Sequence, residues 1–220
     1  MFTKDIINNN IPRLQLTDTV SKALQLMTDF RLTCLPVVSE GKYLGLVSED
    51  ELLDVEDEKM HIDFLKKKLV NISVKDDEHF LNAVNMMNQH EAHVVPVVND
   101  KNDYEGIITT PDLLKTVGEY CGANESGGIV VFERERIHFS ISEISRIAES
   151  NDFTILHLNT TTQAETGLLM VTIHLNKREL STLVATFERF DYRVIYFTGN
   201  KNQENEIETN YQHLMNYLDI

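Results

Sequence analysis

The first half of the chain repeats one pattern of apolar positions after 60 residues. Four apolar residues at positions i, i+3, i+4 and i+7 form one face of a predicted helix: Val20, Ala23, Leu24 and Met27. Sixty positions later, four apolar residues form the same face: Phe80, Ala83, Val84 and Met87. Because a whole amphipathic helix recurs in register, we interpret this half of the chain as two copies of one structural unit.

The strands predicted beside these helices recur in the same way. Leu35–Val38 and Val95–Val98 are short apolar strands, each with proline at the second position. After a polar turn come Gly45–Leu53 and Gly106–Leu114, each a strand end followed by a helix start. Each copy therefore predicts the order strand, helix, strand, turn, strand, helix. Between the copies, residues 54–69 predict an acidic helix start and then a helix with three residues facing inward: Ile62, Leu65 and Leu69.

The turn from the last strand to the last helix of each copy gathers groups that suit a ligand. Thr109 is a good N-cap and Asp112 follows three residues later, so a hydroxyl and a carboxylate lie beside free backbone N–H groups. Such a helix end attracts phosphate, and a carboxylate accepts hydrogen bonds from sugar hydroxyls. The alternative is a capping arrangement that only starts the helix. One copy cannot bury both faces of its sheet, so we expect two copies to pack about a pseudo-two-fold axis with these turns at a cleft.

The tandem motifs LPVV and VPVV, each followed by G-x-x-[ST]-x-x-[DE], resemble a pair of cystathionine-β-synthase (CBS) domains, a Bateman module, over roughly residues 1–118. The resemblance implies a non-catalytic regulatory module that binds an adenosine-containing ligand between the repeats and acts through a homodimer. The ligands that it implies are AMP, ADP, ATP and S-adenosylmethionine. The alternative function is a ligand-free scaffold for dimerisation or for a protein partner.

The same resemblance assigns roles to individual residues. It places phosphate at Thr109 and the ribose at Asp112, and it takes the base-facing positions from two segments: Ile72, Ser73, Val74, His93, Val95 and Pro96. The alternative for these base-facing positions is that they are core. In the first repeat, the equivalent residues form a weaker second site: Ser48, Glu51, Leu35 and Pro36. Glu51 stands where the family usually has Asp, and Ser-x-x-Glu is also a capping box, so we predict that the second repeat holds the better site.

The second half of the chain begins after a glycine-rich junction at residues 119–128. Apolar patterns then predict strand, helix, two strands, helix and strand, which is the order of a ferredoxin-like βαββαβ fold. This half resembles an ACT domain, in which a glycine usually precedes the first helix when amino acids bind. Phe139 stands at that place, so we expect no amino-acid site there. A CBS pair followed by an ACT-like domain is also the layout of the bacterial acetoin-utilisation accessory proteins, which the whole chain resembles.

The predicted fold class is therefore α+β, with mixed α/β architecture in three parts. A CBS pair spans residues 1–120, with repeats at about 1–60 and 61–120, and an ACT-like domain spans residues 128–200. A helix at residues 204–220 has one apolar side: Tyr211, Leu214, Met215 and Leu218. This apolar side and the exposed edges of a ferredoxin-like sheet predict a homodimer or a larger homo-oligomer.

Composition narrows the classes of partner and chemistry. The 220 residues carry a formal net charge of −15, which argues against nucleic acid and anionic membranes as partners. The chain has no apolar run that could span a bilayer and begins without a signal peptide, so we expect a cytoplasmic protein. Cys34 and Cys121 lie in no metal-binding spacing, and no further ligands accompany His90 and His93 in sequence. With no catalytic or phosphate-loop motif, the sequence predicts neither a metal site nor an enzyme.

Overall fold

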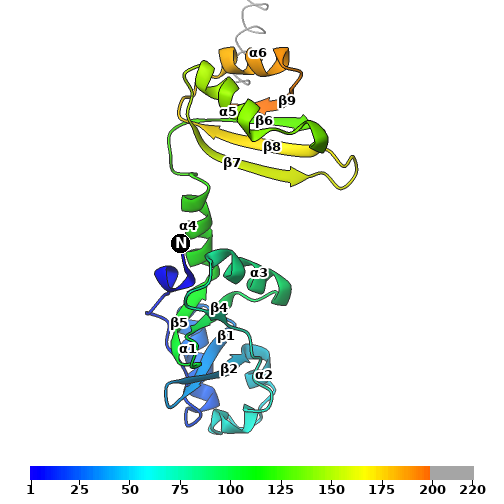
Figure 1. Ribbon diagram of the computed structural model, residues 1–220. Coiled ribbons are helices and arrows are strands. Elements are labelled where there is room, and N and C mark those ends of the chain that lie inside the picture. Colours follow the sequence, from blue (N-terminus) through cyan, green and yellow to red (C-terminus); the bar gives the residue numbers. More distant parts are fainter. Residues whose placement is uncertain (199–220) are drawn as a thin grey trace, which may run out of the picture. The chain divides into compact units, whose positions relative to one another are not determined.

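The computed structural model describes residues 1–198, which divide into two compact units (Figure 1). The first unit runs from Met1 to Val117, and the second begins at Gly118. Both units contain helices and strands, so the expected mixed α and β class is confirmed. The helix expected at residues 204–220 lies outside the described residues. Every helix within residues 1–198 is too short or too polar to cross a membrane.

From their first long helix onward, the two repeats of the first unit share one order of elements. After the short 3-10 helix η1 (Thr3–Ile6), the first repeat contains α1 (Val20–Phe30), β1 (Cys34–Ser39), β2 (Lys42–Ser48) and α2 (Glu49–Leu53). The second contains β3 (Val74–Lys75), α3 (Phe80–His90), β4 (Val94–Val98), β5 (Tyr104–Thr109) and α4 (Thr110–Tyr120). Both hairpins even shift register at the same place, between Val37 and Val38 and between Val97 and Val98. The repeat predicted from the apolar pattern therefore extends to the backbone.

The leading strand predicted for each repeat forms as a strand only in the second. There β3 pairs in parallel with β4, in a sheet of order β3-β4-β5. In the first repeat, Leu14 makes an isolated parallel bridge to Val37, and the sheet contains only β1 and β2. Leu14 is nevertheless fully buried, so the residue keeps its place in the core while the strand around it is reduced to one bridge.

The helix predicted at residues 54–69 is wrong. Helical structure there is limited to the 3-10 turn η2 (Ile62–Leu65), in which Ile62 and Leu65 are buried as predicted. The segment before η2 instead serves α1, because the N–H of Val20 donates to the carbonyl oxygen of Met60 at 3.0 Å. The first N–H groups of a helix have no partner within it, and this contact satisfies one of them. A tertiary contact therefore takes the place of local helix formation.

Each repeat is paired with the segment that leads into the other repeat. Val70, which leads into the second repeat, exchanges two backbone hydrogen bonds with Leu46 of β2, at 2.8 and 3.0 Å. Asn8, which leads into the first repeat, donates its N–H to the carbonyl oxygen of Ile107 in β5 at 2.7 Å. Because both lead-in segments cross over, neither repeat can leave the other without losing edge hydrogen bonds.

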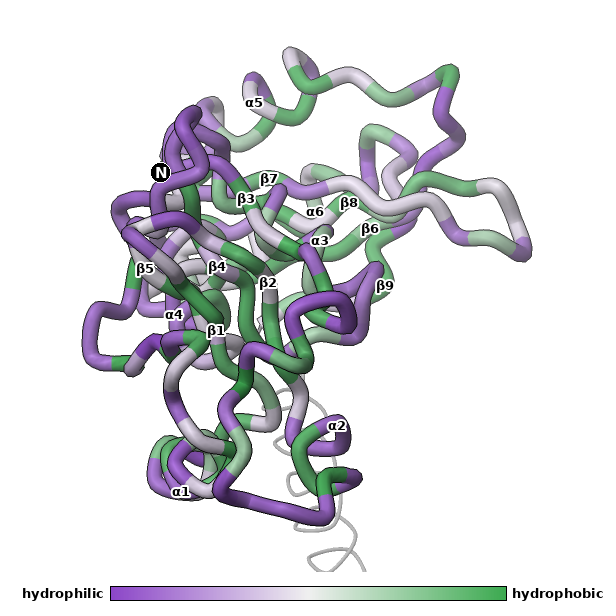
Figure 2. Tube along the Cα trace, turned by 90° about the horizontal axis from the view of Figure 1, so that it is seen from below, coloured by the Kyte–Doolittle hydropathy of each residue, from purple (hydrophilic) through white to green (hydrophobic). Residues whose placement is uncertain are grey.

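Each repeat of the first unit has its own hydrophobic core, and the core of the second repeat includes a residue of the first. The faces predicted for α1 and α3 are buried at Val20, Ala23 and Met27, and at Phe80, Ala83 and Met87. Leu46 of the first repeat packs in the core of the second, together with Val95 and Ile107. In Figure 2 the strands of this unit are mainly hydrophobic (green) and the connecting loops are mainly hydrophilic (purple). Burial of apolar surface therefore favours the paired state of the repeats.

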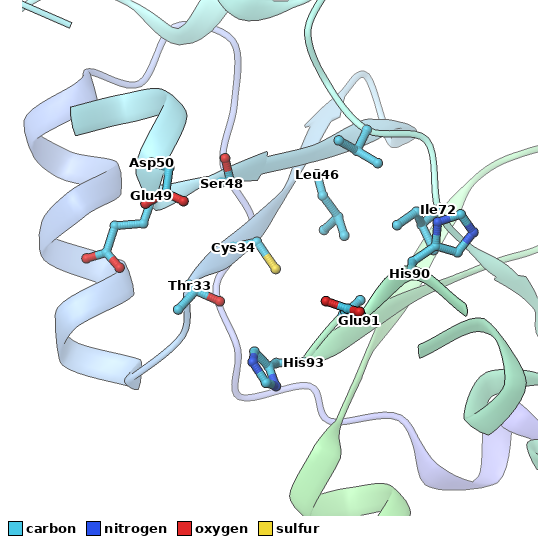
Figure 3. Close-up of a pocket in the computed structure, with 12 residues that line it drawn as sticks. Thr33, Cys34, Leu46, Ser48, Glu49, Asp50, Ile72, His90, Glu91 and His93 are labelled. Atoms are coloured by element: carbon cyan, nitrogen blue, oxygen red, sulfur yellow. The ribbon is translucent and has the colours of Figure 1, made fainter. Parts of the chain in front are cut away.

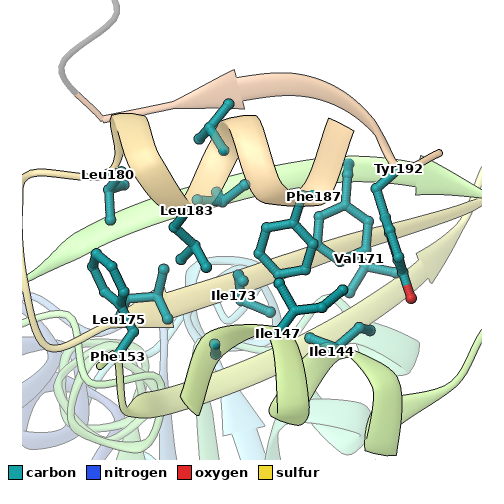
Figure 4. Close-up of a cluster of buried hydrophobic side chains, with 14 of the residues drawn as sticks. Ile144, Ile147, Phe153, Val171, Ile173, Leu175, Leu180, Leu183, Phe187 and Tyr192 are labelled. Atoms are coloured by element: carbon teal, nitrogen blue, oxygen red, sulfur yellow. The ribbon is translucent and has the colours of Figure 1, made fainter. Parts of the chain in front are cut away.

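The second unit has the predicted ferredoxin-like order of elements. They are β6 (Gly128–Arg134), α5 (Ile141–Ser150), β7 (Ile155–Thr162), β8 (Leu169–Leu175), α6 (Ser181–Arg189) and β9 (Arg193–Phe197). The sheet is antiparallel throughout, with strand order β7-β8-β6-β9, and α5 and α6 cover one of its faces (Figure 1). Apolar side chains of both helices and the sheet meet in one core (Figure 4). At its edge, the hydroxyl of Tyr192 donates to Glu143 Oε2 at 2.6 Å.

Candidate functional site

A cavity of about 280 Å³ lies between the two repeats, at the end of β2 (Figure 3). The first repeat lines it with the start of β1, the end of β2 and the first residues of α2: Thr33, Cys34, Leu46, Ser48, Glu49 and Asp50. The second repeat lines it with its lead-in segment and the turn after α3: Val70, Ile72, His90, Glu91, Ala92 and His93. The cavity therefore exists only because the repeats pack together.

Two equivalent backbone hydrogen bonds position the residues that precede β1 and β4. The N–H of Glu49 donates to the carbonyl oxygen of Thr33 at 2.8 Å. At the equivalent place in the second repeat, the N–H of Thr110 donates to the carbonyl oxygen of His93 at 3.0 Å. Each bond ties the start of a helix to the start of a strand. Thr33 and His93 are repeat equivalents, and both line the same cavity.

The motif at the start of α2 is a closed capping box. The N–H and the hydroxyl of Ser48 both donate to Glu51 Oε2, at 3.2 and 3.1 Å. The N–H of Glu51 donates in return to Ser48 Oγ at 3.3 Å. The Ser-x-x-Glu sequence thus forms the cap that its spacing predicts. Ser48 remains at the cavity wall, whereas Glu51 is not among the lining residues.

The motif at the start of α4 makes the same contacts and one more. The N–H and the hydroxyl of Thr109 donate to Asp112 Oδ2, at 3.1 and 2.6 Å, and the N–H of Asp112 donates to Thr109 Oγ1 at 3.4 Å. Asn8 Nδ2 also donates to Asp112 Oδ2, at 3.3 Å. A ribose hydroxyl at Asp112 would therefore compete with the amide of Asn8. The residue that makes the corresponding edge bridge in the first repeat is Val70, which has no polar side chain to place there.

The structure separates residues that the sequence groups into one site. Ile72 and His93 line the cavity of Ser48, and neither Thr109 nor Asp112 is among the residues around it. The other strand positions assigned to the two sites are buried: Leu35, Pro36, Val74, Val95 and Pro96. Ser73 is half-buried. The alternative that some base-facing positions are core therefore describes Val74 and Val95, which are both members of the core of the second repeat.

Several lining residues have no counterpart in the sequence-based assignment: Thr33, Cys34, Glu49, Asp50, His90 and Glu91. The internal repeat provides a signal for one of them, Thr33. Thr33 precedes the LPVV strand as His93 precedes the VPVV strand, so the role given to His93 applies equally to Thr33. The turn after α3 carries no such signal, because its placement depends on how the repeats pack.

The chemistry of the walls is mixed. Leu46, Val70 and Ile72 are apolar, and burial raises the pKa of the Cys34 thiol, so this side chain stays a neutral wall. In Figure 3 the sulfur of Cys34 and the carboxylate of Glu91 face the space between the labelled side chains, whereas Glu49 extends away from it. Within residues 1–198, no three His, Cys, Asp or Glu side chains are grouped so that they could hold a metal ion.

A second hollow, of about 460 Å³, lies between α3 and α4. Its walls are mainly apolar: Val84, Met87, Leu113, Leu114 and Val117. Three residues belong to both spaces, because Glu91, Ala92 and His93 line the hollow as well as the cavity. The turn after α3 is therefore a common wall between the cavity and the helix pair.

The comparisons with known proteins match the first half of the chain. A family model described as "CBS domain" matches residues 4–58 and residues 63–119, one match for each repeat. A CBS domain-containing protein from Methanocaldococcus jannaschii is 25% identical over 121 residues, which are 52% of this chain and 94% of that protein.

Longer relatives share only this region. An inosine-5'-monophosphate dehydrogenase from Methanocaldococcus jannaschii is 28% identical over 112 residues, which are 50% of this chain and 22% of the enzyme. A homoserine O-acetyltransferase from Methanobrevibacter ruminantium is 29% identical over 119 residues, which are 53% of this chain and 24% of the enzyme. The chain thus spans less than a quarter of the length of these two curated relatives.

A solved structure supports the fold. A CBS domain pair/ACT domain protein from Thermotoga maritima matches with a TM-score of 0.50 and 21% sequence identity, over 55% of this chain and 98% of that chain. At this identity the likeness concerns the fold alone.

Proposed function

The chain belongs to the CBS-domain family, and we propose that its first unit is a regulatory module that binds an adenosine-containing ligand in the cavity at Ser48. The observation that carries this proposal is the cavity, which both repeats line. A ligand bound there contacts both repeats at once, so it stabilises one arrangement of the pair over others. The alternative is a ligand-free scaffold, in which the cavity stays empty and the module serves only assembly.

The size and walls of the cavity fit the nucleoside part of such a ligand. Its volume of about 280 Å³ lies just below the usual range of small-molecule sites, which begins at about 300 Å³. The apolar side chains of Leu46 and Ile72 suit a purine base, because base and wall bury apolar surface together. The hydroxyls of Thr33 and Ser48 are suitable partners for ribose hydroxyls.

The motifs predict that the site at Thr109 and Asp112 binds the ligand better than the site at Ser48. We propose the opposite order. Asp112 already accepts hydrogen bonds from Thr109 and Asn8, so a ligand there must displace Asn8. The lead-in segment of the second repeat places apolar Val70 and Ile72 at the cavity of Ser48, where they face the ligand without competing for its polar groups. The roles of Thr109 and Asp112 at a second, weaker site stay a prediction.

The ligand signal would pass through the turn after α3. Glu91, Ala92 and His93 line both the cavity and the hollow between α3 and α4, so a ligand that moves this turn also changes the exposed helix pair. We propose that a second copy of the chain covers this helix pair in a homodimer. Leu114 is 72% exposed on α4, and Leu53 is 64% exposed at the equivalent place on α2. Large apolar side chains exposed at equivalent places on both repeats are typical of an interaction surface.

The homodimer is tested by light scattering at micromolar concentration. We expect the parent protein to be dimeric and Leu114→Glu to shift the population to monomer, because a buried carboxylate without a partner is costly. Gln25→Glu, which adds a charge at an exposed residue of α1 outside the hollow between α3 and α4, is the control for the effect of added charge alone. A monomeric parent protein would remove the dimer from the proposal and leave the ligand site standing.

Ligand binding is tested by thermal unfolding with adenosine, AMP, ADP, ATP and S-adenosylmethionine. A specific ligand at a hundredfold excess over its Kd stabilises the native state by about 2.7 kcal/mol. We expect this stabilisation with at least one compound and its loss in Cys34→Phe, because the larger side chain projects into the cavity from β1. Cys121→Phe is the control, since Cys121 is outside the residues that line the cavity. No stabilisation by any compound would favour the scaffold.

For the second unit we propose an ACT-like regulatory domain without an amino-acid site. The support is its strand order and Phe139, whose side chain packs against the core in front of α5. A side chain at this place denies a ligand the close backbone approach that glycine allows. The likeness of the whole chain to acetoin-utilisation accessory proteins stays a prediction.

A further inference from the structure

Apart from two histidines, the charged side chains at the cavity of Ser48 are all acidic. Three carboxylates are among the lining residues, Glu49, Asp50 and Glu91, and all are at least partly exposed. None of the residues that line the cavity in the described part of the chain is Lys or Arg. The nearest Lys and Arg residues along the chain, Arg31 and Lys68, are exposed and lie outside the lining. His90 and His93 are bases that carry charge only when they are protonated. At a pH at which imidazole is neutral, a ligand in this cavity therefore meets carboxylates without a positively charged partner.

The backbone offers little compensation to an anion. Phosphate is commonly held by free N–H groups at the start of a helix. Here the N–H of Glu49 is bonded to the carbonyl oxygen of Thr33, and the N–H of Glu51 is bonded to Ser48 Oγ. The helix α2 is also only five residues long, and its first turn carries three acidic side chains. Both the hydrogen bonds and the charge at this helix start disfavour phosphate.

From these observations we infer that the cavity selects a nucleoside whose 5' substituent is neutral or positively charged, and that it discriminates against 5'-phosphates. This inference rests on the proposed function, because it concerns the ligand class of the same cavity. In the orientation that we infer, the apolar wall of Leu46, Val70 and Ile72 takes the base. The 5' substituent then lies beside Asp50 and Glu91, the two exposed carboxylates of the lining. A sulfonium or ammonium group is attracted there and a phosphate is repelled.

The test is calorimetric titration at about pH 8, where an ordinary imidazole is neutral, and at low ionic strength. The four probes are adenosine, S-adenosylmethionine, S-adenosylhomocysteine and ATP. S-adenosylmethionine and S-adenosylhomocysteine differ by one methyl group and the sulfonium charge. The ratio of their affinities therefore reports how strongly the carboxylates at the cavity attract a positive charge. We expect S-adenosylmethionine to bind at least about threefold more tightly than S-adenosylhomocysteine, and ATP at least about tenfold more weakly than adenosine. Added salt should reduce both ratios, because the carboxylates at the cavity are screened.

Charge variants assign these ratios to named residues. In Asp50→Asn/Glu91→Gln, the penalty on ATP relative to adenosine should fall by about tenfold, while the affinity for adenosine changes less than about twofold. Glu91→Lys should go further and favour ATP over adenosine. Asp77→Asn, which removes an exposed carboxylate of the same unit from outside the lining, should leave every ratio unchanged.

The outcomes separate this inference from the proposed function. ATP that binds the parent protein more tightly than adenosine would overturn the inference and leave the proposed function standing, with an exposed cation such as Arg31 or Lys68 as the partner of the phosphates. No binding by any of the four probes would overturn the proposed function itself. Ratios that persist in Asp50→Asn/Glu91→Gln would show that these carboxylates do not set the preference.

Discussion

Gly127→Ala is expected to destabilise the second unit by about 3 kcal/mol or more. A Cβ at this position would lie 1.9 Å from the carbonyl oxygen of Leu175 and 2.7 Å from Nε2 of His174. The oxygen belongs to the backbone of β8, which pairs with β6 at Gly128, so it cannot move without disturbing the ladder. Calorimetry should show the transition of the second unit shifted down by more than about 10 °C, since 1 kcal/mol shifts a domain of this size by about 4–8 °C.

Gly118→Ala is the matched control for this variant. Gly118 lies within α4, and a Cβ there would meet no other atom within 4 Å. Alanine restricts the unfolded chain and favours a helix, so this substitution should stabilise the protein by about 0.4–1 kcal/mol. If Gly127→Ala unfolds together with the parent protein, the close packing of the junction against β8 is contradicted.

Gly106→Ala should be the second most costly change, because it pushes the N-terminal lead-in segment away from β5. A Cβ at Gly106 would lie 2.2 Å from Cγ2 of Ile7, and the residue has φ +153°, which favours glycine. We expect a loss of about 2–4 kcal/mol from crowding and backbone strain together. Chemical denaturation of the whole chain measures it.

A second substitution identifies the cause. Ile7→Ala removes the methyl group that meets the new Cβ, and the next atom of Ile7, its Cβ, lies 3.6 Å away. The double variant Ile7→Ala/Gly106→Ala should therefore be less destabilised than the sum of the single variants by about 1–2 kcal/mol. Strict additivity would show that the lead-in segment does not rest on β5 in solution.

The elements of this fold are local in origin, which is why the sequence predicts most of them. The faces of α1 and α3 follow from the 3.6-residue period, and both copies carry it at the same positions. The helix predicted at residues 54–69 does not form, because a contact between segments distant in sequence determines the structure there. Ile62 and Leu65 fit one turn of helix, but the carbonyl oxygen of Met60 is used by α1, a contact that no local pattern encodes.

The residues that share the cavity are harder to predict than the fold, because they too depend on contacts between segments distant in sequence. The motif residues are visible in sequence, and they form the caps that their spacing predicts. Which residues share a cavity depends on the crossing of the lead-in segments, which brings Ile72 and His93 to Ser48. Asn8 approaches Asp112 across 104 positions of sequence, and a pairing of that length leaves no periodic trace.

Amide hydrogen exchange with and without saturating ligand tests the central claim most directly. With any compound that stabilises the protein among adenosine, AMP, ATP and S-adenosylmethionine, we expect slowed exchange in three segments that line the cavity: residues 33–34, 48–50 and 90–93. Exchange at residues 109–112 should change less, because Asn8 already covers Asp112. Slowed exchange confined to residues 109–112 or to the second unit, with the three cavity segments unchanged, would contradict the account.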